Sequence, residues 1–122
     1  MIKFLIKKYK INKRNILGHS DIAPDRKKDP GEKFPWEYLA KKNIGIWHNL
    51  DKQKLRKLRK MKCNEKMKNL FLKNLFRIGY AKKGKKSRYL VFVIKAFQRR
   101  FRPELVNGKI DQECLLISQN LT

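Results

Sequence analysis

The sequence lacks any long apolar run and has few cysteines. No stretch of 18 consecutive apolar residues occurs, so no segment is expected to span a membrane. The apolar residues near the start are too few for the core of a signal peptide, and no small-residue cleavage site follows them. Only two cysteines are present, Cys63 and Cys114, without the spacing of a disulfide framework or a zinc finger. We expect both to be ordinary thiols in the core or on the surface.

Acidic residues are also scarce. The sequence has 10 Asp and Glu against 33 Lys and Arg, which gives a formal net charge of +23. Such a balance is typical of proteins that bind nucleic acid, an acidic membrane surface or another polyanion. Here the bases are spread through nearly every segment among many asparagines and isoleucines, a mixture that AT-rich codon usage also produces. We therefore expect no specific nucleic-acid partner, and keep a basic nucleic-acid-binding protein as an alternative.

The segment 18–31, GHSDIAPDRKKDPG, carries the strongest chemical signal. Its prolines and glycines oppose a regular helix or central strand, which favours a loop that holds a rigid polar site. His19 and Asp29 are plausible zinc ligands, although a catalytic zinc usually takes three protein ligands and a water. Asp29 precedes Pro30 and is expected to be extended, so Lys27 can project on the same side of the chain. A fixed cation would then stand beside the metal.

This segment resembles the motif GHSDIAPxRKxDPG of the zinc-dependent N-acetylmuramoyl-L-alanine amidases of bacterial cell-wall turnover. By the resemblance, His19 and Asp29 are the second and third zinc ligands, and Lys27 stabilises the oxyanion of the tetrahedral intermediate. Asp25 stands where the family often carries glycine. Beyond the motif the match continues through Phe34-Pro35-Trp36, Leu39, Ile44-Gly45 and Trp47.

The resemblance also implies that part of the machinery is absent from these residues. The family's first zinc histidine and its catalytic glutamate lie well upstream of the motif, and nothing before Gly18 supplies them. We expect the chain to be the C-terminal part of a longer enzyme, with an incomplete zinc site and no activity alone. Candidate partners are peptidoglycan or muropeptides and a separately encoded N-terminal half. The compartment stays open between cell envelope and cytoplasm.

The elements around the motif follow from apolar spacing and from the resemblance. Apolar residues at helical spacing predict a helix that begins near residue 2 and ends near Asn12. The resemblance implies a short strand at residues 15–17, and residues 35–42 are expected to form a short helix. We interpret Trp47 as a packing residue and His48 as an ordinary surface histidine, since His48 has no companion ligand at zinc spacing.

Residues 51–62 combine three apolar side chains, one every third position, with many bases. The apolar positions are Leu55, Leu58 and Met61. One interpretation is a solvated linker helix with a narrow apolar stripe, and the other is a basic amphipathic helix on an anionic surface. We favour the linker because the apolar face is so thin.

Three further helices are expected between residues 64 and 122. Asn64, Ser87 and Asp111 are good N-caps, Gly79 suits a left-handed helix end, and Pro103 terminates the second helix. This region resembles the peptidoglycan-binding domain appended to the same amidases, on the strings FRIGY, AFQRRFRP and NG followed by Asp111.

Together these signals predict a mainly α chain, in which the C-terminal remnant of an α/β amidase domain precedes a small three-helix peptidoglycan-binding bundle. The expected limits are 1–50 for the amidase part, 51–63 for the basic linker helix and 64–122 for the bundle. The leading hypothesis is a truncated amidase with an incomplete zinc site. The alternative from the binding class is a module that holds peptidoglycan without cutting it.

Overall fold

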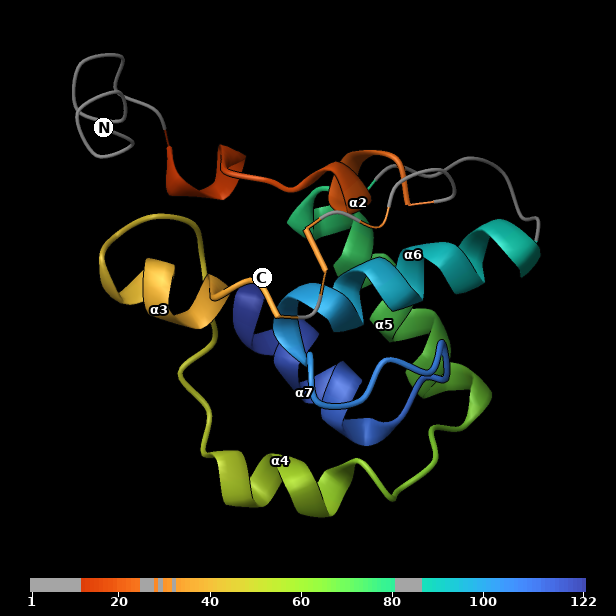
Figure 1. Ribbon diagram of the computed structural model, residues 1–122. Coiled ribbons are helices and arrows are strands. Elements are labelled where there is room, and N and C mark those ends of the chain that lie inside the picture. Colours follow the sequence, from red (N-terminus) through yellow and green to blue (C-terminus); the bar gives the residue numbers. More distant parts are fainter. Residues whose placement is uncertain (1–11, 25–27, 29, 32, 81–86) are drawn as a thin grey trace.

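The computed structural model describes residues 12–24, 28, 30–31, 33–80 and 87–122. A 3-10 turn and six α-helices make up its regular structure (Figure 1). Their bounds are η1 Lys13–Asn15, α2 His19–Ile22, α3 Trp36–Lys41, α4 Lys52–Leu58, α5 Glu65–Ile78, α6 Ser87–Phe101 and α7 Gln112–Leu121. Within the described ranges there is no strand, and an isolated antiparallel bridge joins Lys62 to Asp111. The prediction of a mainly helical chain is therefore confirmed.

The strand expected at residues 15–17 is wrong. Asn15 closes the 3-10 turn, and Ile16 is extended but belongs to no strand. A strand needs a neighbour to pair its backbone groups, and the described part of the chain offers none here. The helix predicted near residues 2–12 falls outside the described residues.

Side-chain caps and a glycine set the helix ends as the sequence predicted. Asn64 Oδ1 accepts from the Met67 backbone N–H at 2.8 Å, and Asp111 Oδ1 accepts from that of Cys114 at 3.0 Å. Gly79 follows α5 with φ of 129°, a value that favours glycine. The short helix predicted at 35–42 is also formed, as α3.

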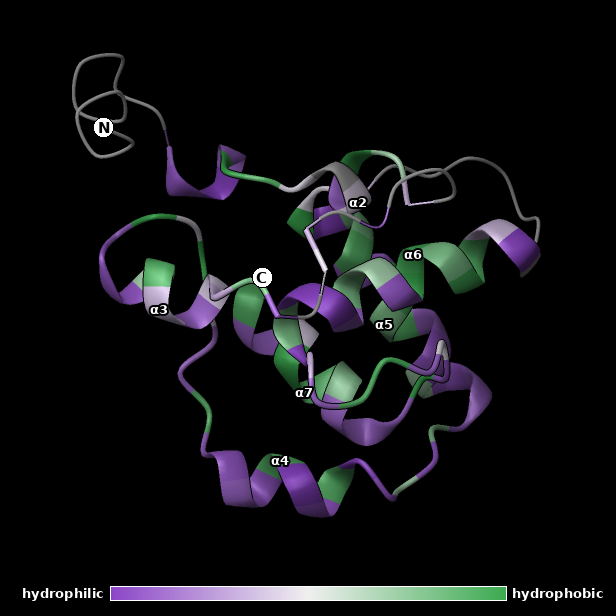
Figure 2. Cartoon of the chain, viewed as in Figure 1, coloured by the Kyte–Doolittle hydropathy of each residue, from purple (hydrophilic) through white to green (hydrophobic). Residues whose placement is uncertain are grey.

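The main core lies where α5, α6 and α7 meet. Figure 2 shows the green, apolar sides of these helices turned toward one another. Phe71 of α5 and Phe97 of α6 are fully buried and meet edge to face, with ring centroids 5.2 Å apart. Cys63 and Cys114 are buried free thiols, and burial raises the pKa of the Cys114 thiol to about 12. Both cysteines are thus core residues.

Helix α4 lies against α7 at the edge of this core. Leu55 is only 4% exposed and belongs to the core cluster, whereas the bases of α4 stay on the outside. The thin apolar stripe is therefore enough to dock one turn of α4, and the assignment of residues 51–63 as a linker stays a prediction. Among the helices of the described residues, none combines the length and apolarity needed to cross a membrane.

The first part of the chain also lies on the helical core. Helices α2 and α3 both contact α6, and Figure 1 shows α2, α3 and α4 placed around α5, α6 and α7. Helix α2, which belongs to the 18–31 motif, therefore packs on the helix that carries AFQRRF. The proposed domain limits at residues 50 and 63 stay predictions.

Candidate functional site

The start of the predicted metal loop is one helical turn, α2. His19 is its first residue, and Ser20 and Asp21 are buried at 3% and 6% exposure. The side chain of His19 is outside the described part of the structure, as are Lys27 and Asp29. The predicted zinc ligands and catalytic lysine therefore stay predictions. No group of three His, Cys, Asp or Glu among the described side chains could hold a metal ion.

The carboxylate of Asp21 anchors this turn to the rest of the molecule. Its Oδ2 accepts from the Gly18 backbone N–H at 3.1 Å and from Arg100 Nη1 at 2.9 Å. Its Oδ1 accepts from the Tyr80 hydroxyl at 2.6 Å. Arg100 also donates through Nη2 to the Ile16 carbonyl at 2.9 Å. The turn that carries His19 is thus bonded to α6 and to the end of α5.

The ion pair between Asp21 and Arg100 is buried. The side chains of Arg100 and Asp21 are 3% and 4% exposed, and the Arg100 guanidinium lies 4.1 Å from the Trp36 ring centroid. Burial and then the Asp21 charge raise the pKa of Tyr80 well above its usual value, so the phenol stays protonated and donates. Removal of one partner from such a pair leaves a buried charge uncompensated, at a cost of about 3–5 kcal/mol.

Gly18 allows the two ends of the motif to meet. A Cβ atom at this position would overlap Pro30 Cδ and would lie 3.4 Å from a carbon of the Trp36 ring. Only glycine leaves room for this approach, and its φ is not in the left-handed region. The beginning and the end of the motif are therefore in contact, with Trp36 beneath them.

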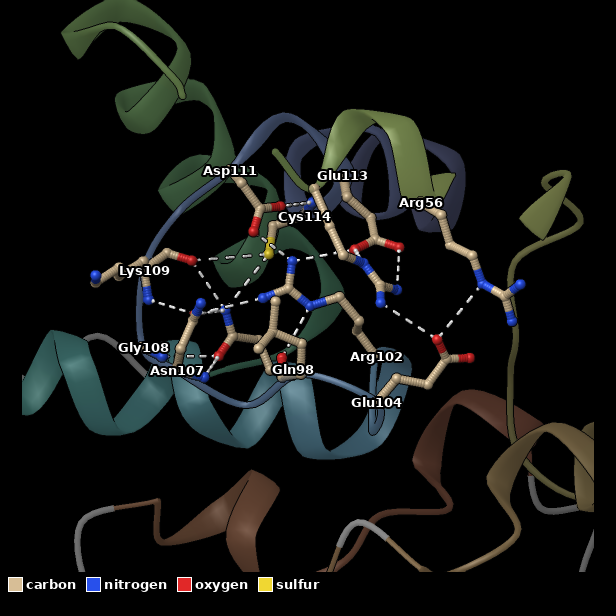
Figure 3. A network of polar contacts seen from close by, with 12 residues as sticks. Arg56, Gln98, Arg102, Glu104, Asn107, Gly108, Lys109, Asp111, Glu113 and Cys114 are labelled. Carbon is tan, nitrogen blue, oxygen red and sulfur yellow. Dashed lines mark hydrogen bonds and ion pairs between the residues drawn. The ribbon is translucent and has the colours of Figure 1, made fainter. Parts of the chain in front are cut away.

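The AFQRRFRP and NG strings form a polar network of their own (Figure 3). Gln98 Oε1 accepts from the backbone N–H groups of Asn107 and Gly108, both at 2.9 Å. Gln98 Nε2 donates to the Lys109 carbonyl at 2.9 Å. Gln98 is fully buried, and its side chain makes the hydrogen bonds that these backbone groups of the loop would otherwise make with water. The string fixes the loop between α6 and α7.

Arg102 connects the same loop to α7 and α4. It donates to Asp111, to Glu113 Oε1 at 3.1 Å and to the Leu105 carbonyl at 2.9 Å. Glu113 in turn accepts two hydrogen bonds from Arg59, each 3.0 Å long, in the planar geometry of a strong pair. Much of the second motif therefore holds the backbone and is not offered to a ligand.

One site assignment from the sequence is wrong. His48 is buried, not on the surface: its ring stacks on Trp47 with centroids 5.0 Å apart, and its Nδ1 accepts from the Leu50 backbone N–H at 3.2 Å. Burial lowers the pKa of His48. The packing role of Trp47 is confirmed, because its ring centroid lies 5.7 Å from that of Phe101.

Sequence reasoning also missed the roles of Asp21, Tyr80 and Arg100. Each lies in a string that resembles the family, and this resemblance was the signal in the sequence that could have pointed to them. Their pairing could not be read from spacing, because 79 residues separate Asp21 from Arg100.

Comparisons with known proteins show that the chain is similar to known amidases. No family model matches the sequence. The chain is 37% identical over 122 residues to N-acetylmuramoyl-L-alanine amidase AmiD of Escherichia coli, which covers 99% of this chain and 44% of AmiD. A further match, 56% identical over 38 residues, is to 1,6-anhydro-N-acetylmuramyl-L-alanine amidase AmpD of Haemophilus influenzae, over 30% of this chain and 21% of AmpD.

Solved structures agree with the sequence matches. An E. coli AmiD structure, in complex with the substrate anhydro-N-acetylmuramic acid-L-Ala-D-gamma-Glu-L-Lys, superposes with a TM-score of 0.81 and 38% identity over 98% of this chain and 47% of that one. AmpDh3 of Pseudomonas aeruginosa gives 0.75 at 31% identity, over 98% of this chain and 50% of that one. This chain thus spans about half the length of its relatives. In sequence and in fold, the chain is similar to about half of the N-acetylmuramoyl-L-alanine amidase AmiD and of AmpDh3.

Proposed function

We propose that this chain supplies part of the active site of an N-acetylmuramoyl-L-alanine amidase, which splits the amide between N-acetylmuramic acid and L-alanine. His19 and Asp29 bind Zn²⁺, and Lys27 stabilises the oxyanion. The observation that supports this most is the unbroken 18–31 motif within a homology that extends over 99% of the chain. Peptidoglycan fragments are the proposed ligands, because one solved relative is an AmiD complex with a muropeptide and another is AmpDh3 with anhydromuramic pentapeptide.

The described residues fit such a metal loop. Gly18 lies against Pro30, and in the sequence the two proposed ligands are the next residue after Gly18 and the residue before Pro30. An imidazole and a carboxylate are donors that zinc accepts in catalytic sites. The turn that begins with His19 is held by the buried Asp21 network, which fixes the backbone of the site.

When bound, zinc would polarise the scissile carbonyl and lower the pKa of a water toward neutrality. The residues of the chain contribute a positive charge near the reacting carbonyl and a fixed position for the proposed ligand His19. Lys27 places a cation where negative charge develops on the carbonyl oxygen, and such stabilisation is commonly the largest catalytic effect. Arg100 and Tyr80 position the turn that carries His19 through their hydrogen bonds to Asp21. They take no part in the reaction.

By the resemblance, a further zinc histidine and the glutamate that acts as general base lie upstream of the motif, and residues 1–17 contain neither a histidine nor a glutamate. We therefore propose that these 122 residues are inactive by themselves and need an amidase segment that carries the two groups. A second candidate function is a non-catalytic one, in which α5, α6 and α7 form a three-helix peptidoglycan-binding bundle. The observation that favours it is the continuous buried core of these helices.

Calorimetric titration of the polypeptide with Zn²⁺ tests the site. With two protein ligands we expect a dissociation constant of about 1 μM or weaker. His19→Ala and Asp29→Ala should each abolish the binding heat, whereas His48→Gln, which removes the other of the two histidines, should leave it unchanged. Equal binding in all variants would contradict the assignment. Release of L-Ala-peptide from muropeptides by the polypeptide with zinc, lost in Lys27→Ala, would contradict inactivity.

A further inference from the structure

Helix α5 has a basic outer side. Its inner side packs on the core, where Phe71 and Leu75 are fully buried. The bases Lys66, Lys73 and Arg77 are exposed and follow one another at intervals of seven and four residues. At about 3.6 residues per turn, these intervals bring the three side chains onto one stripe of the helix. The stripe therefore presents positive charge to the solvent along most of α5.

The connection that leads into α5 adds two more exposed bases, Lys60 and Lys62. It lies at the outer edge of the molecule (Figure 1). The Met61 carbonyl accepts from the Gln112 backbone N–H at 3.0 Å, and Lys62 forms the isolated bridge to Asp111, so the connection is fixed to the start of α7. We call five exposed bases the basic strip: Lys60, Lys62, Lys66, Lys73 and Arg77.

The charges of the basic strip have no acidic partners. Among the described residues, no ion pair involves any of the five bases. Glu65 is the one acidic residue between positions 60 and 77, and it pairs with Lys68, which is not part of the strip, at 3.7 Å. Arg59, by contrast, pairs with both Glu104 and Glu113. A surface with several unpaired charges of one sign attracts a partner of the opposite sign, which here is an anion.

Exposed apolar side chains accompany these bases. Met61 stands between two lysines of the strip and is 48% exposed, and Leu70 lies on the stripe of α5, one turn after Lys66, and is 39% exposed. The boundary between headgroups and acyl chains of a bilayer accepts basic and apolar side chains together. Lipid therefore matches both features of this surface.

A nucleic acid matches them less well. Binding to a duplex depends mainly on its phosphates, which give an exposed leucine or methionine no apolar partner. Binding to single strands uses aromatic side chains on which the bases stack, and residues 60–77, all of which the structure describes, include no exposed aromatic side chain. The composition of the strip thus favours a lipid surface over a nucleic acid.

We propose that the basic strip binds the surface of an anionic phospholipid bilayer. Its five bases attract the negatively charged headgroups, while Met61 and Leu70 enter the headgroup region. The association is peripheral, since none of the helices of the described residues has the length and apolarity to cross a membrane. It is independent of the proposed amidase site, because the strip includes none of the residues assigned to zinc or to the oxyanion.

The test is co-sedimentation of the 122-residue chain with vesicles of phosphatidylcholine that contain about one quarter phosphatidylglycerol, and with vesicles of phosphatidylcholine alone. We expect binding to the anionic vesicles only. The binding should weaken strongly between about 50 and about 300 mM NaCl, because salt screens exposed charges. Absence of binding to the anionic vesicles at about 50 mM NaCl overturns the proposal, as does equal binding to both kinds of vesicle.

A pair of double variants locates the surface. Lys66→Gln with Lys73→Gln removes two charges from the strip and should weaken vesicle binding about thirtyfold, at about fivefold for each base. Lys13→Gln with Lys41→Gln is the matched control, because it lowers the net charge equally at two exposed lysines outside the strip. The control should stay within about threefold of the original chain. Equal losses in the two double variants would show that net charge alone decides the binding, and would overturn the proposal.

A short DNA duplex distinguishes lipid from another polyanion. Leu70→Gln should weaken binding to the anionic vesicles by about threefold or more, because an apolar side chain no longer enters the headgroup region. Any binding to the duplex should be the same in Leu70→Gln as in the original chain. If the duplex binds through Lys66 and Lys73 while Leu70→Gln binds vesicles as the original chain does, the strip belongs to nucleic acid and the lipid assignment is wrong.

Discussion

Arg100 Nη1 lies 2.9 Å from Asp21 Oδ2 in a buried ion pair between two segments that are far apart in the sequence. Asp21 belongs to the 18–31 motif and Arg100 to the AFQRRFRP string. The helical region is thus more than an attachment to the 18–31 motif, because its α6 supplies a side chain that binds the start of that motif. This relationship leads to the first prediction.

Arg100→Met should destabilise the chain by about 3–5 kcal/mol, because Asp21 would keep a buried charge without its partner. Urea denaturation followed by circular dichroism measures the change. Arg88→Met is the matched control, since Arg88 is an exposed arginine on the same helix. Equal loss in both variants would show that the ion pair has no special role.

Gly18→Ala should also destabilise the chain, by about 1–3 kcal/mol, because the added methyl group overlaps the Pro30 ring. Gly31→Ala, at the other end of the motif, meets nothing within 4 Å and should change the stability little. Thermal melts of the two variants compare them directly. If Gly31→Ala is the more harmful change, the proposed contact between the two ends of the motif is wrong.

Leu55→Ala tests the docking of α4 on α7. Leu55 is 4% exposed, and truncation of a buried leucine to alanine typically costs about 2–5 kcal/mol. Leu70→Ala on α5, where the leucine is 39% exposed, should cost far less. Chemical denaturation gives both values, and a negligible effect at position 55 would contradict the docking of α4 on α7.

His48 should make the stability depend on pH. Its pKa in the folded chain is lowered from 6.5 by burial, so the unfolded chain binds the proton first as the pH falls. Stability should therefore decrease as the pH drops through about 6.5 toward the folded value. Melting temperatures measured between about pH 7.5 and 5.5 should depend less on pH in His48→Gln than in the original chain. His19→Gln is the control for the other histidine and should keep the original dependence. An unchanged slope in His48→Gln would contradict this.

The sequence by itself determined the local features of this protein. The helix starts at Asn64 and Asp111 and the end at Gly79 follow from side-chain caps and backbone freedom within a few residues, and the structure forms them there. The family was also readable from one short segment, because the 18–31 motif keeps residue types and spacing together. Such signals need no knowledge of distant contacts.

Only the tertiary structure decided which side chains meet. Burial of His48, docking of Leu55 and the pairing of Asp21 with Arg100 depend on how whole helices stack, and apolar spacing within one helix does not specify its neighbour. The strand implied at residues 15–17 failed for the same reason, since a strand is defined by a partner and the described residues supply none. A groove lined by residues of α3, α4 and α6 likewise exists only because these three elements converge on it.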